Sequence, residues 1–377
     1  MKAIIKKSNL YGELNFADIA PSKSLLHREI ICSALSKSEK PVFNSKDITA
    51  TYNAMSHILV DDYPCDVGES GSTLRFLIPL SVLLGGRTFI THGNLIKRPL
   101  DEYSCMRYAK IKIVDNKVIT SGELYSGTFT LRGDKSSQFI SGLMFVLPLL
   151  NGTSTIKLTT PLESSAYVFQ TIQVLKRYGI EINTINSYEW EIIGGQKYRP
   201  NKSIIEGDWS YAANYVVANR LGAKISLLGL DDNSLSADKA IKELILCDKV
   251  DISQSPDIFP ILCVNACAKQ TKTLIYNAKR LKIKESDRLN VMCAELKKLG
   301  ARIVVGDDFA EIEGTGSLFG GIVNSNNDHR IAMALTIAGL LLCNDDVIIE
   351  NSECVEKSCP DFYKHIKMVG GDVEIRG

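Results

Sequence analysis

The chain has 377 residues, of which 45% are hydrophobic and 23% are charged, and its formal net charge is +1. These values are typical of a folded globular protein with room for two domains, and they exclude a disordered or low-complexity chain. The charge also argues against non-specific binding to nucleic acid or to an acidic membrane, which needs a large basic excess. An anionic ligand must therefore be bound by local clusters of cations.

The cysteines indicate a reducing compartment. All 10 are irregularly spaced, several lie in apolar runs, and none forms a paired Cys-x-x-Cys set of the zinc or redox kind. We therefore expect a cytoplasmic protein with reduced core cysteines, no metal and no cofactor. The apolar run within residues 1–7 is too short for a signal peptide, and the run at 331–343 is too short to span a bilayer.

In chain order, one unit recurs six times: a polar lead-in, an apolar helix of about three turns, a turn and a strand. The lead-ins are residues 22–24, 70–73, 135–138, 208–210, 255–257 and 327–330, and the closing strands are residues 41–43, 88–90, 154–156, 225–227, 273–276 and 347–349. The helix of the third copy is expected over residues 139–150. Six copies predict two domains of three units, with the break between copies three and four.

Further pairs of helix and strand lie between the repeats, for example a helix over residues 167–176 and a strand over residues 180–182. The fold class is therefore mixed α/β. Each lead-in precedes a helix, where free backbone N–H groups attract anions, so converging lead-ins would bind an anionic ligand. The simpler alternative is that these Ser and Asp residues only cap their helices.

The most charged stretch, residues 280–289, contains four cations and two carboxylates and leads into an amphipathic helix. Leu289, Met292, Leu296 and Leu299 repeat at helical spacing, and Gly300 predicts the helix end. Lys284 and Arg288 would share one face, with Glu285 three residues from Arg288. A carboxylate among cations is a candidate acid or base, although a solvated helix end has a similar composition.

Other clusters suit anions. Lys23, Ser24 and Arg28 stand within two turns of a helix start, and Pro99 would occupy the first position of a helix, with Arg98 at its entrance. The sequence contains no Gly-x-x-x-x-Gly-Lys-Ser/Thr loop, no His-Glu-x-x-His and no Gly-x-Ser-x-Gly. These absences disfavour a P-loop nucleotide enzyme, a metal site of the His-Glu-x-x-His kind and a serine hydrolase of the elbow type.

Together the motifs closely resemble the 5-enolpyruvylshikimate-3-phosphate (EPSP) synthase family, the 3-phosphoshikimate 1-carboxyvinyltransferases, over nearly the whole chain. The segments that carry the resemblance are Ser22-Lys23-Ser24-Leu25-Leu26-His27-Arg28, Gly68-Glu69-Ser70-Gly71-Ser72-Thr73-Leu74-Arg75, Arg98-Pro99, Ser136-Ser137-Gln138-Phe139, Glu206-Gly207-Asp208, Pro256-Asp257, Lys284-Glu285-Ser286-Asp287-Arg288, Asp328-His329-Arg330 and Lys357-Ser358-Cys359-Pro360-Asp361.

The resemblance implies a two-domain enolpyruvyl transferase fold, in which each domain has three βαβαββ-like repeats and the active site lies in the interdomain cleft. The N-terminal domain would span residues 21–206. The C-terminal domain would combine residues 1–20 with residues 207–377 through a double-crossover hinge. The protein would be a cytoplasmic monomer that binds neither nucleic acid nor membrane.

The implied reaction transfers the enolpyruvyl group of phosphoenolpyruvate to the 5-hydroxyl of shikimate 3-phosphate in chorismate and aromatic amino acid biosynthesis. The resemblance assigns catalysis to Asp257, Glu285 and Lys23. Its shikimate 3-phosphate ligands are Lys23, Ser24, Arg28, Ser136, Ser137, Gln138, Ser164, Tyr167, Asp257 and Lys284. Its phosphoenolpyruvate ligands are Lys23, Gly71, Arg98, Gln138, Arg288, Arg330 and Lys357. Because Gly71 leaves room beside the backbone, a compact phosphonate such as glyphosate is expected to compete with phosphoenolpyruvate.

The sequence departs from the family pattern at Glu69, where the family often has Asn, and at Arg280, where some members have an Asn that contacts the substrate. The loop after Pro21 is also one residue shorter. Two alternatives remain open. One is a related enolpyruvyl transferase that acts on a UDP-sugar, which the motifs at Lys23 and at residues 136–138 disfavour. The other is a catalytically silent relative that binds phosphosugars, which would require loss of the acidic and basic residues that are present here.

Overall fold

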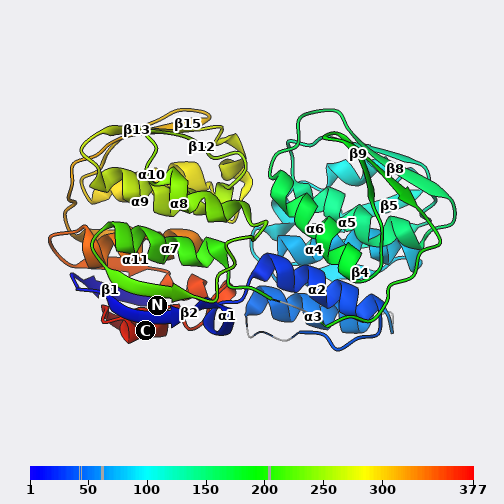
Figure 1. Cartoon of the computed structure of the whole chain (residues 1–377), viewed down its shortest axis with the longest axis horizontal. Helices are drawn as coiled ribbons and strands as arrows, with labels where there is room; N and C mark the ends of the chain where they lie inside the picture. Colours follow the sequence, from blue (N-terminus) through cyan, green and yellow to red (C-terminus); the bar gives the residue numbers. More distant parts are fainter. Residues whose placement is uncertain (42, 44, 61–62, 203–204) are drawn as a thin grey trace. The chain divides into compact units, whose positions relative to one another are not determined.

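The computed structural model describes residues 1–41, 43, 45–60, 63–202 and 205–377. It divides into two compact units, which we call the C-terminal unit (Met1–Ser22 with Glu206–Gly377) and the N-terminal unit (Lys23–Ile205). The sequence placed the breaks after residues 20 and 206, whereas the contacts place them after residues 22 and 205. Figure 1 labels the elements of both units.

The N-terminal unit contains two four-stranded sheets, each with one parallel and two antiparallel pairings. The helices of the unit are α2 (Lys23–Leu35), α3 (Lys46–Ile58), α4 (Gly71–Leu83), α5 (Ser137–Val146) and α6 (Ser165–Arg177). One sheet has the order β3 (Cys65–Asp66), β4 (Thr88–Ile90), β6 (Lys117–Gly122) and β5 (Ala109–Val114). The other has the order β7 (Thr128–Leu131), β8 (Thr153–Leu158), β10 (Glu189–Ile193) and β9 (Asn183–Asn186).

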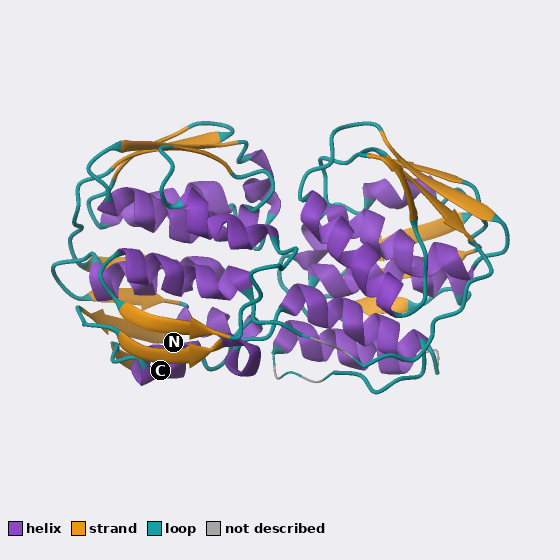
Figure 2. Cartoon of the chain, in the orientation of Figure 1, coloured by secondary structure: helices purple, strands orange, loops and turns teal. Residues whose placement is uncertain are grey.

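In the C-terminal unit, two layers of helices lie between sheets (Figure 2). The longer helices are α7 (Trp209–Arg220), α9 (Phe259–Ala268), α10 (Arg288–Lys298) and α11 (His329–Leu341), and the shorter ones are α1 (Phe16–Ile19), α8 (Ile241–Leu244) and α12 (Phe362–Met368). One sheet has the order β12 (Lys249–Asp251), β13 (Lys272–Tyr276), β15 (Phe309–Glu313) and β14 (Arg302–Val305). The second has the order β16 (Gly321–Asn324), β17 (Val347–Glu350), β1 (Lys2–Lys6) and β18 (Asp372–Arg376).

The start of the chain is an internal part of the C-terminal unit. Strand β1 lies between β17 and β18 and pairs antiparallel with both. Strand β2 (Tyr11–Asn15) pairs in parallel with β11 (Lys224–Leu228). The 3-10 turns of the two units are η1 (Leu95–Lys97), η2 (Asp101–Cys105), η3 (Leu147–Leu149), η4 (Ala237–Ala240), η5 (Pro256–Ile258), η6 (Lys279–Ile283) and η7 (Ser352–Lys357).

The periodicity after residue 288 is confirmed as α10. Leu289, Met292, Leu296 and Leu299 have no exposed surface, and Gly300 ends the helix with a φ of +88°. Polar lead-ins begin most repeat helices as N-caps: the side chains of Ser70, Ser136, Asp208 and Asp328 each accept a backbone N–H bond. The capping explanation therefore holds for these four lead-ins.

Five of the six predicted repeat strands are confirmed, as β4, β8, β11, β13 and β17. The remaining one, at residues 41–43, includes Val42, which lies outside the described residues, and its two neighbours are not in a strand. The predicted helix over residues 139–150 ends earlier, at Val146, where the turn that contains Pro148 follows, because proline lacks the N–H that would continue the helix.

The predicted strand at residues 180–182 is wrong. The N–H of Ile180 bonds to the carbonyl of Leu175 at 3.0 Å and closes the end of α6, with Gly179 at a φ of +77°. The strand β9 begins only at Asn183. Within the part of the chain that the structure describes, no helix is both long and apolar enough to cross a membrane.

Candidate active site

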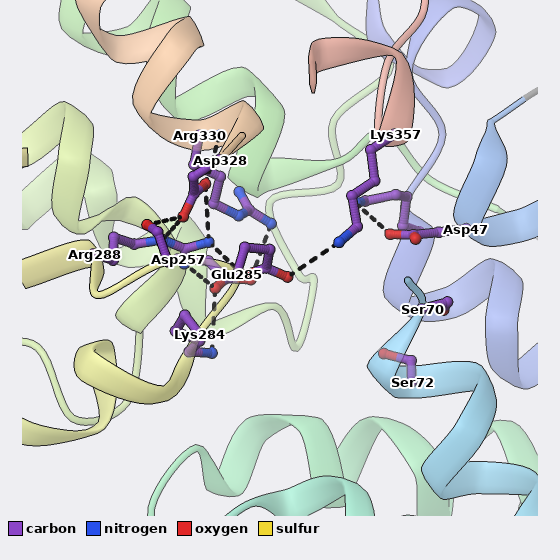
Figure 3. A network of polar contacts seen from close by, with 12 residues as sticks. Asp47, Ser70, Ser72, Asp257, Lys284, Glu285, Arg288, Asp328, Arg330 and Lys357 are labelled. Atoms are coloured by element: carbon purple, nitrogen blue, oxygen red, sulfur yellow. Dashed lines mark hydrogen bonds and ion pairs between the residues drawn. The ribbon is translucent and has the colours of Figure 1, made fainter. Parts of the chain in front are cut away.

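In the C-terminal unit, the ends of several elements bring charged side chains together. Asp257 lies in η5, just before α9, and Glu285 lies in the loop between η6 and α10. Arg288 and Arg330 lie in the first turns of α10 and α11, and Lys357 ends η7. Figure 3 shows these residues directed toward one another.

Arg288 is the centre of this cluster. Its side chain has no exposed surface, and its guanidinium contacts three carboxylates. Nη1 lies 2.9 Å from Oδ1 of Asp257, Nη2 lies 2.7 Å from Oε2 of Glu285, and Nε lies 2.9 Å from Oδ2 of Asp328. A single buried cation therefore fixes the positions of both candidate proton-transfer carboxylates.

Asp257 is surrounded by cations. Besides Arg288, Nη2 of Arg330 lies 2.9 Å from Oδ2, and Nζ of Lys284 lies 3.4 Å from Oδ1. Burial acts to raise the pKa of Asp257, but the three cations outweigh it and hold that pKa well below its usual value. Burial lowers the pKa of Lys284, and Asp257 opposes this shift. Asp257 is thus a carboxylate that accepts hydrogen bonds at neutral pH.

The second carboxylate, Glu285, is shared between two cations. Its Oε2 accepts from Arg288, and its Oε1 lies 4.0 Å from Nζ of Lys357. The side chains of Glu285, Asp257 and Lys357 retain 17%, 23% and 10% of their surface, so a ligand can reach all three. The Arg288 side chain differs from these three, because it has no exposed surface.

In the N-terminal unit, Lys23 is in the first turn of α2, and its Nζ lies 3.6 Å from Oδ2 of Asp47 in the first turn of α3. Arg28, one turn later, is buried and joins α2 to α6: Nε donates to the Thr171 hydroxyl at 2.8 Å, and Nη2 donates to the Tyr167 carbonyl at 2.8 Å. Ser164 precedes α6 in a left-handed conformation, with a φ of 55°. The structure therefore brings the predicted residues Arg28, Ser164 and Tyr167 to the start of α6.

Gly71 and Arg98 also meet. A Cβ atom placed on Gly71 would lie 2.8 Å from Nη1 of Arg98, so only glycine leaves the guanidinium where it is.

The prediction that Pro99 begins a helix is wrong. Arg98 follows η1, and η2 begins only at Asp101, with Leu100 before it. The carbonyl of Pro99 instead accepts from Nη2 of Arg75 at 3.1 Å.

A hydrogen-bonded series connects the starts of α4 and α5. Nη1 of Arg75 donates to Oε1 of Gln138 at 2.8 Å, and Nε2 of Gln138 donates to the Ser72 hydroxyl at 2.8 Å. The guanidinium fixes which end of the Gln138 amide is the donor. Ser136 caps α5, and Ser137 is its first residue, so all three predicted residues lie at one helix start.

Three residues with clear positions in these networks received no role from the sequence. Arg75 stood in a quoted motif, but its partners and those of Asp47 are distant in sequence, so no local pattern could show what these two residues contact. Asp328 stood in a quoted motif, and its place before a helix marked it only as a cap. Each unit has its own set of cations, and the set in the C-terminal unit includes the three carboxylates that contact Arg288. Such sets can bind phosphate and carboxylate groups and transfer protons.

Solved structures with the same architecture define the class of the fold. EPSP synthase from Acinetobacter baumannii matches with a TM-score of 0.80 and 20% identity, and the match covers 99% of this chain and 100% of that one. The enolpyruvyl transferase NikO from Streptomyces tendae matches with a TM-score of 0.77 and 15% identity, covering 99% and 98%. The two-unit fold is that of the enolpyruvyl transferases.

Sequence comparison identifies the family within this class. The family model described as EPSP synthase (3-phosphoshikimate 1-carboxyvinyltransferase) matches residues 44–248 and 242–366. The 3-phosphoshikimate 1-carboxyvinyltransferases of Clostridium perfringens and Clostridium acetobutylicum are 40% and 42% identical to this chain. The first match covers 98% of both chains, and the second covers 94% of this chain and 95% of the relative. The chain belongs to the EPSP synthase family.

Proposed function

We propose that the two sets of residues described above carry out 3-phosphoshikimate 1-carboxyvinyl transfer, the activity of the family to which the chain belongs. The enzyme moves the carboxyvinyl group of phosphoenolpyruvate to the 5-hydroxyl of shikimate 3-phosphate and releases phosphate. Each substrate carries a phosphate and a carboxylate, so binding both requires many cations. The chain provides them at Lys23, Arg98, Lys284, Arg330 and Lys357.

Each substrate is assigned its own set of residues, and Lys23 and Gln138 belong to both sets. Shikimate 3-phosphate would be bound by Lys23, Ser24, Arg28, Ser136, Ser137, Gln138, Ser164, Tyr167, Asp257 and Lys284. Phosphoenolpyruvate would be bound by Lys23, Gly71, Arg98, Gln138, Arg288, Arg330 and Lys357. Most of these side chains are intermediate in exposure. Gly71, Ser137, Ser164 and Lys357 are buried, as are Arg28 and Arg288. The two arginines also bond to protein acceptors, so we expect them to act chiefly by holding their neighbours in place.

Catalysis follows from the two carboxylates. Asp257 accepts the proton of the 5-hydroxyl, while Glu285 donates a proton to the methylene carbon of phosphoenolpyruvate. The oxygen then bonds to the neighbouring cationic carbon and forms a tetrahedral intermediate. Cleavage of the bond from that carbon to the phosphate oxygen releases phosphate, and the new methyl group returns a proton to Glu285. Lys23 would stabilise the charge that develops on the phosphate.

The observation that carries this proposal is the position of Arg288 between Asp257 and Glu285, at 2.9 Å and 2.7 Å. The guanidinium holds the base for the hydroxyl and the acid for the carbon at a fixed separation, as a reaction with two proton transfers requires. We also propose that the enzyme is a cytoplasmic monomer. None of its 10 cysteines is in a disulfide, which is consistent with the reducing cytoplasm.

The test is phosphate release by the purified full-length chain from phosphoenolpyruvate and shikimate 3-phosphate. A parallel reaction replaces shikimate 3-phosphate with a UDP-sugar, the acceptor of the related class of enolpyruvyl transferase. We expect phosphate only with shikimate 3-phosphate. Release with the UDP-sugar alone would assign the chain to the related activity, and release with neither would refute the proposal.

A further inference from the structure

A series of buried hydrogen bonds crosses three helices of the N-terminal unit. Nδ1 of His27 in α2 lies 2.7 Å from the Thr51 hydroxyl in α3, which lies 2.5 Å from the Thr73 hydroxyl in α4. The Thr73 hydroxyl donates in turn to the Ser70 hydroxyl at 2.7 Å. All four side chains are buried, and the two threonines have no exposed surface. No role has been given to any of the four in the reaction described above.

The series has one consistent direction. A hydroxyl has a single hydrogen, and Thr73 gives its own to Ser70, so Thr73 must accept from Thr51. Thr51 then donates its hydrogen to the Thr73 hydroxyl, which lies 2.5 Å away, rather than to the carbonyl of Asp47, which lies 3.3 Å away. Thr51 must therefore accept from His27, which requires a neutral imidazole with its hydrogen on Nδ1.

The pKa of His27 agrees with this tautomer. Burial lowers the pKa of the imidazole to about 3, and the charges of Lys23 and Arg28 lower it in the same direction. His27 is therefore neutral throughout the physiological range, and its one ring hydrogen is available to Thr51.

Both ends of the series adjoin residues assigned to phosphoenolpyruvate. His27 lies one helical turn after Lys23, and Ser70 is the N-cap residue directly before Gly71. Ser70 Oγ accepts from both the hydroxyl and the backbone N–H of Thr73, so its own hydrogen is left to donate at the start of α4. A donor held there would add to the backbone N–H groups that attract an anion.

We propose that His27 is a positioning residue, which acts through the two threonines to orient the Ser70 hydroxyl and the first turn of α4 for phosphoenolpyruvate. This inference rests on the proposed function and adds residues that do not contact the reacting atoms. A series that only filled the core would influence folding, whereas a positioning series influences the KM for one substrate.

The test compares Thr51→Val, which keeps the volume and removes the hydroxyl, with Thr51→Ser, which keeps the hydroxyl. Phosphate release is measured with phosphoenolpyruvate varied at saturating shikimate 3-phosphate, and then with the roles reversed. In Thr51→Val we expect the KM for phosphoenolpyruvate to rise about tenfold, with kcat within about threefold, as loss of one buried hydrogen bond implies. In Thr51→Ser the KM should stay close to that of the wild type.

A second pair keeps the test decisive if Thr51→Val does not fold. In His27→Asn the amide nitrogen lies near the position of Nδ1 and can donate to Thr51, whereas in His27→Gln it lies one bond farther out. We expect a near-normal KM for phosphoenolpyruvate in His27→Asn and a raised one in His27→Gln. Equal values within each pair, or an equal rise in the KM for shikimate 3-phosphate, would overturn the positioning role.

The two proposals fail in different ways. If the wild-type chain released no phosphate from the two substrates, the proposed function would be refuted before any variant was compared. If the wild type were active and Thr51→Val had an unchanged KM for phosphoenolpyruvate, only the role of His27 would be refuted.

Discussion

Arg288 and Asp328 form a two-point ion pair in which neither side chain has exposed surface. Nε of Arg288 lies 2.9 Å from Oδ2 of Asp328, and Nη2 lies 3.2 Å from Oδ1. Asp328 also caps α11 by accepting the N–H of Arg330 at 3.0 Å. The pair thus joins the starts of α10 and α11, and it directs the rest of the guanidinium toward Asp257 and Glu285.

We predict that Asp328→Asn both destabilises the protein and reduces its turnover. The amide can still cap α11, but it removes the charge of the carboxylate partner of Arg288 that has no exposed surface, and breaking such a buried pair costs about 3–5 kcal/mol. Urea unfolding and phosphate release measure the two effects. The matched control is Asp287→Asn, because the Asp287 carboxylate caps α10 by accepting from Asn290 and, among the described residues, forms no ion pair with the cluster. Equal behaviour of the two variants would contradict the role given to Asp328.

A second prediction concerns stability and pH. The folded state keeps His27 neutral down to a pKa of about 3, whereas the unfolded chain takes up a proton near 6.5. Between these values the unfolded state binds one more proton, so stability falls as the pH decreases, by about 1.4 kcal/mol per pH unit. His27→Asn removes this dependence.

Unfolding free energies of the wild type and His27→Asn should therefore be compared at pH 7 and pH 5. We expect the wild type to lose about 2 kcal/mol more than the variant over this interval, since only the part below pH 6.5 contributes. Parallel losses would show that the imidazole is protonated in the folded state.

Gly71→Ala provides a third prediction. The added methyl group would lie 2.8 Å from Nη1 of Arg98 and must displace this guanidinium. We expect inhibition by glyphosate, measured against phosphoenolpyruvate, to weaken more than kcat does, because turnover at saturation does not depend on binding strength. When Arg98 is also replaced by lysine, the slimmer side chain leaves room for the added methyl group. Gly71→Ala should then weaken inhibition by glyphosate less than it does beside Arg98. An additive double-mutant cycle would show that the effect does not pass through Arg98.

The helix starts were readable from the sequence because local chemistry determines them. Ser70, Asp208 and Asp328 precede apolar runs, and each caps a helix in the structure. The periodicity of α10 was equally local. The same locality explains the failure at Pro99, since a proline that can begin a helix can also stand between two 3-10 turns.

Partners distant in sequence could not be predicted in this way. Asp328 lies 40 residues after Arg288, and Thr51 lies 24 residues after His27, so only the packing of the helices brings them together. The cations near Glu285 were visible as a charged stretch, but the stretch did not show that one guanidinium contacts both carboxylates.

Glu285→Gln tests the central part of the mechanism. The amide is similar in size and can keep a contact with Arg288, but it cannot donate and recover a proton at carbon. We expect both substrates to bind nearly as well as in the wild type, while turnover falls by about a hundredfold or more.

The most direct measurement is the incorporation of solvent deuterium into the methylene carbon of phosphoenolpyruvate in the presence of shikimate 3-phosphate. We propose that Glu285 protonates that carbon reversibly, so the wild type should show exchange, and we predict that Glu285→Gln loses exchange and turnover in the same proportion. Near-normal exchange in the variant would contradict the assignment and leave Glu285 as a charged residue that only pairs with Arg288.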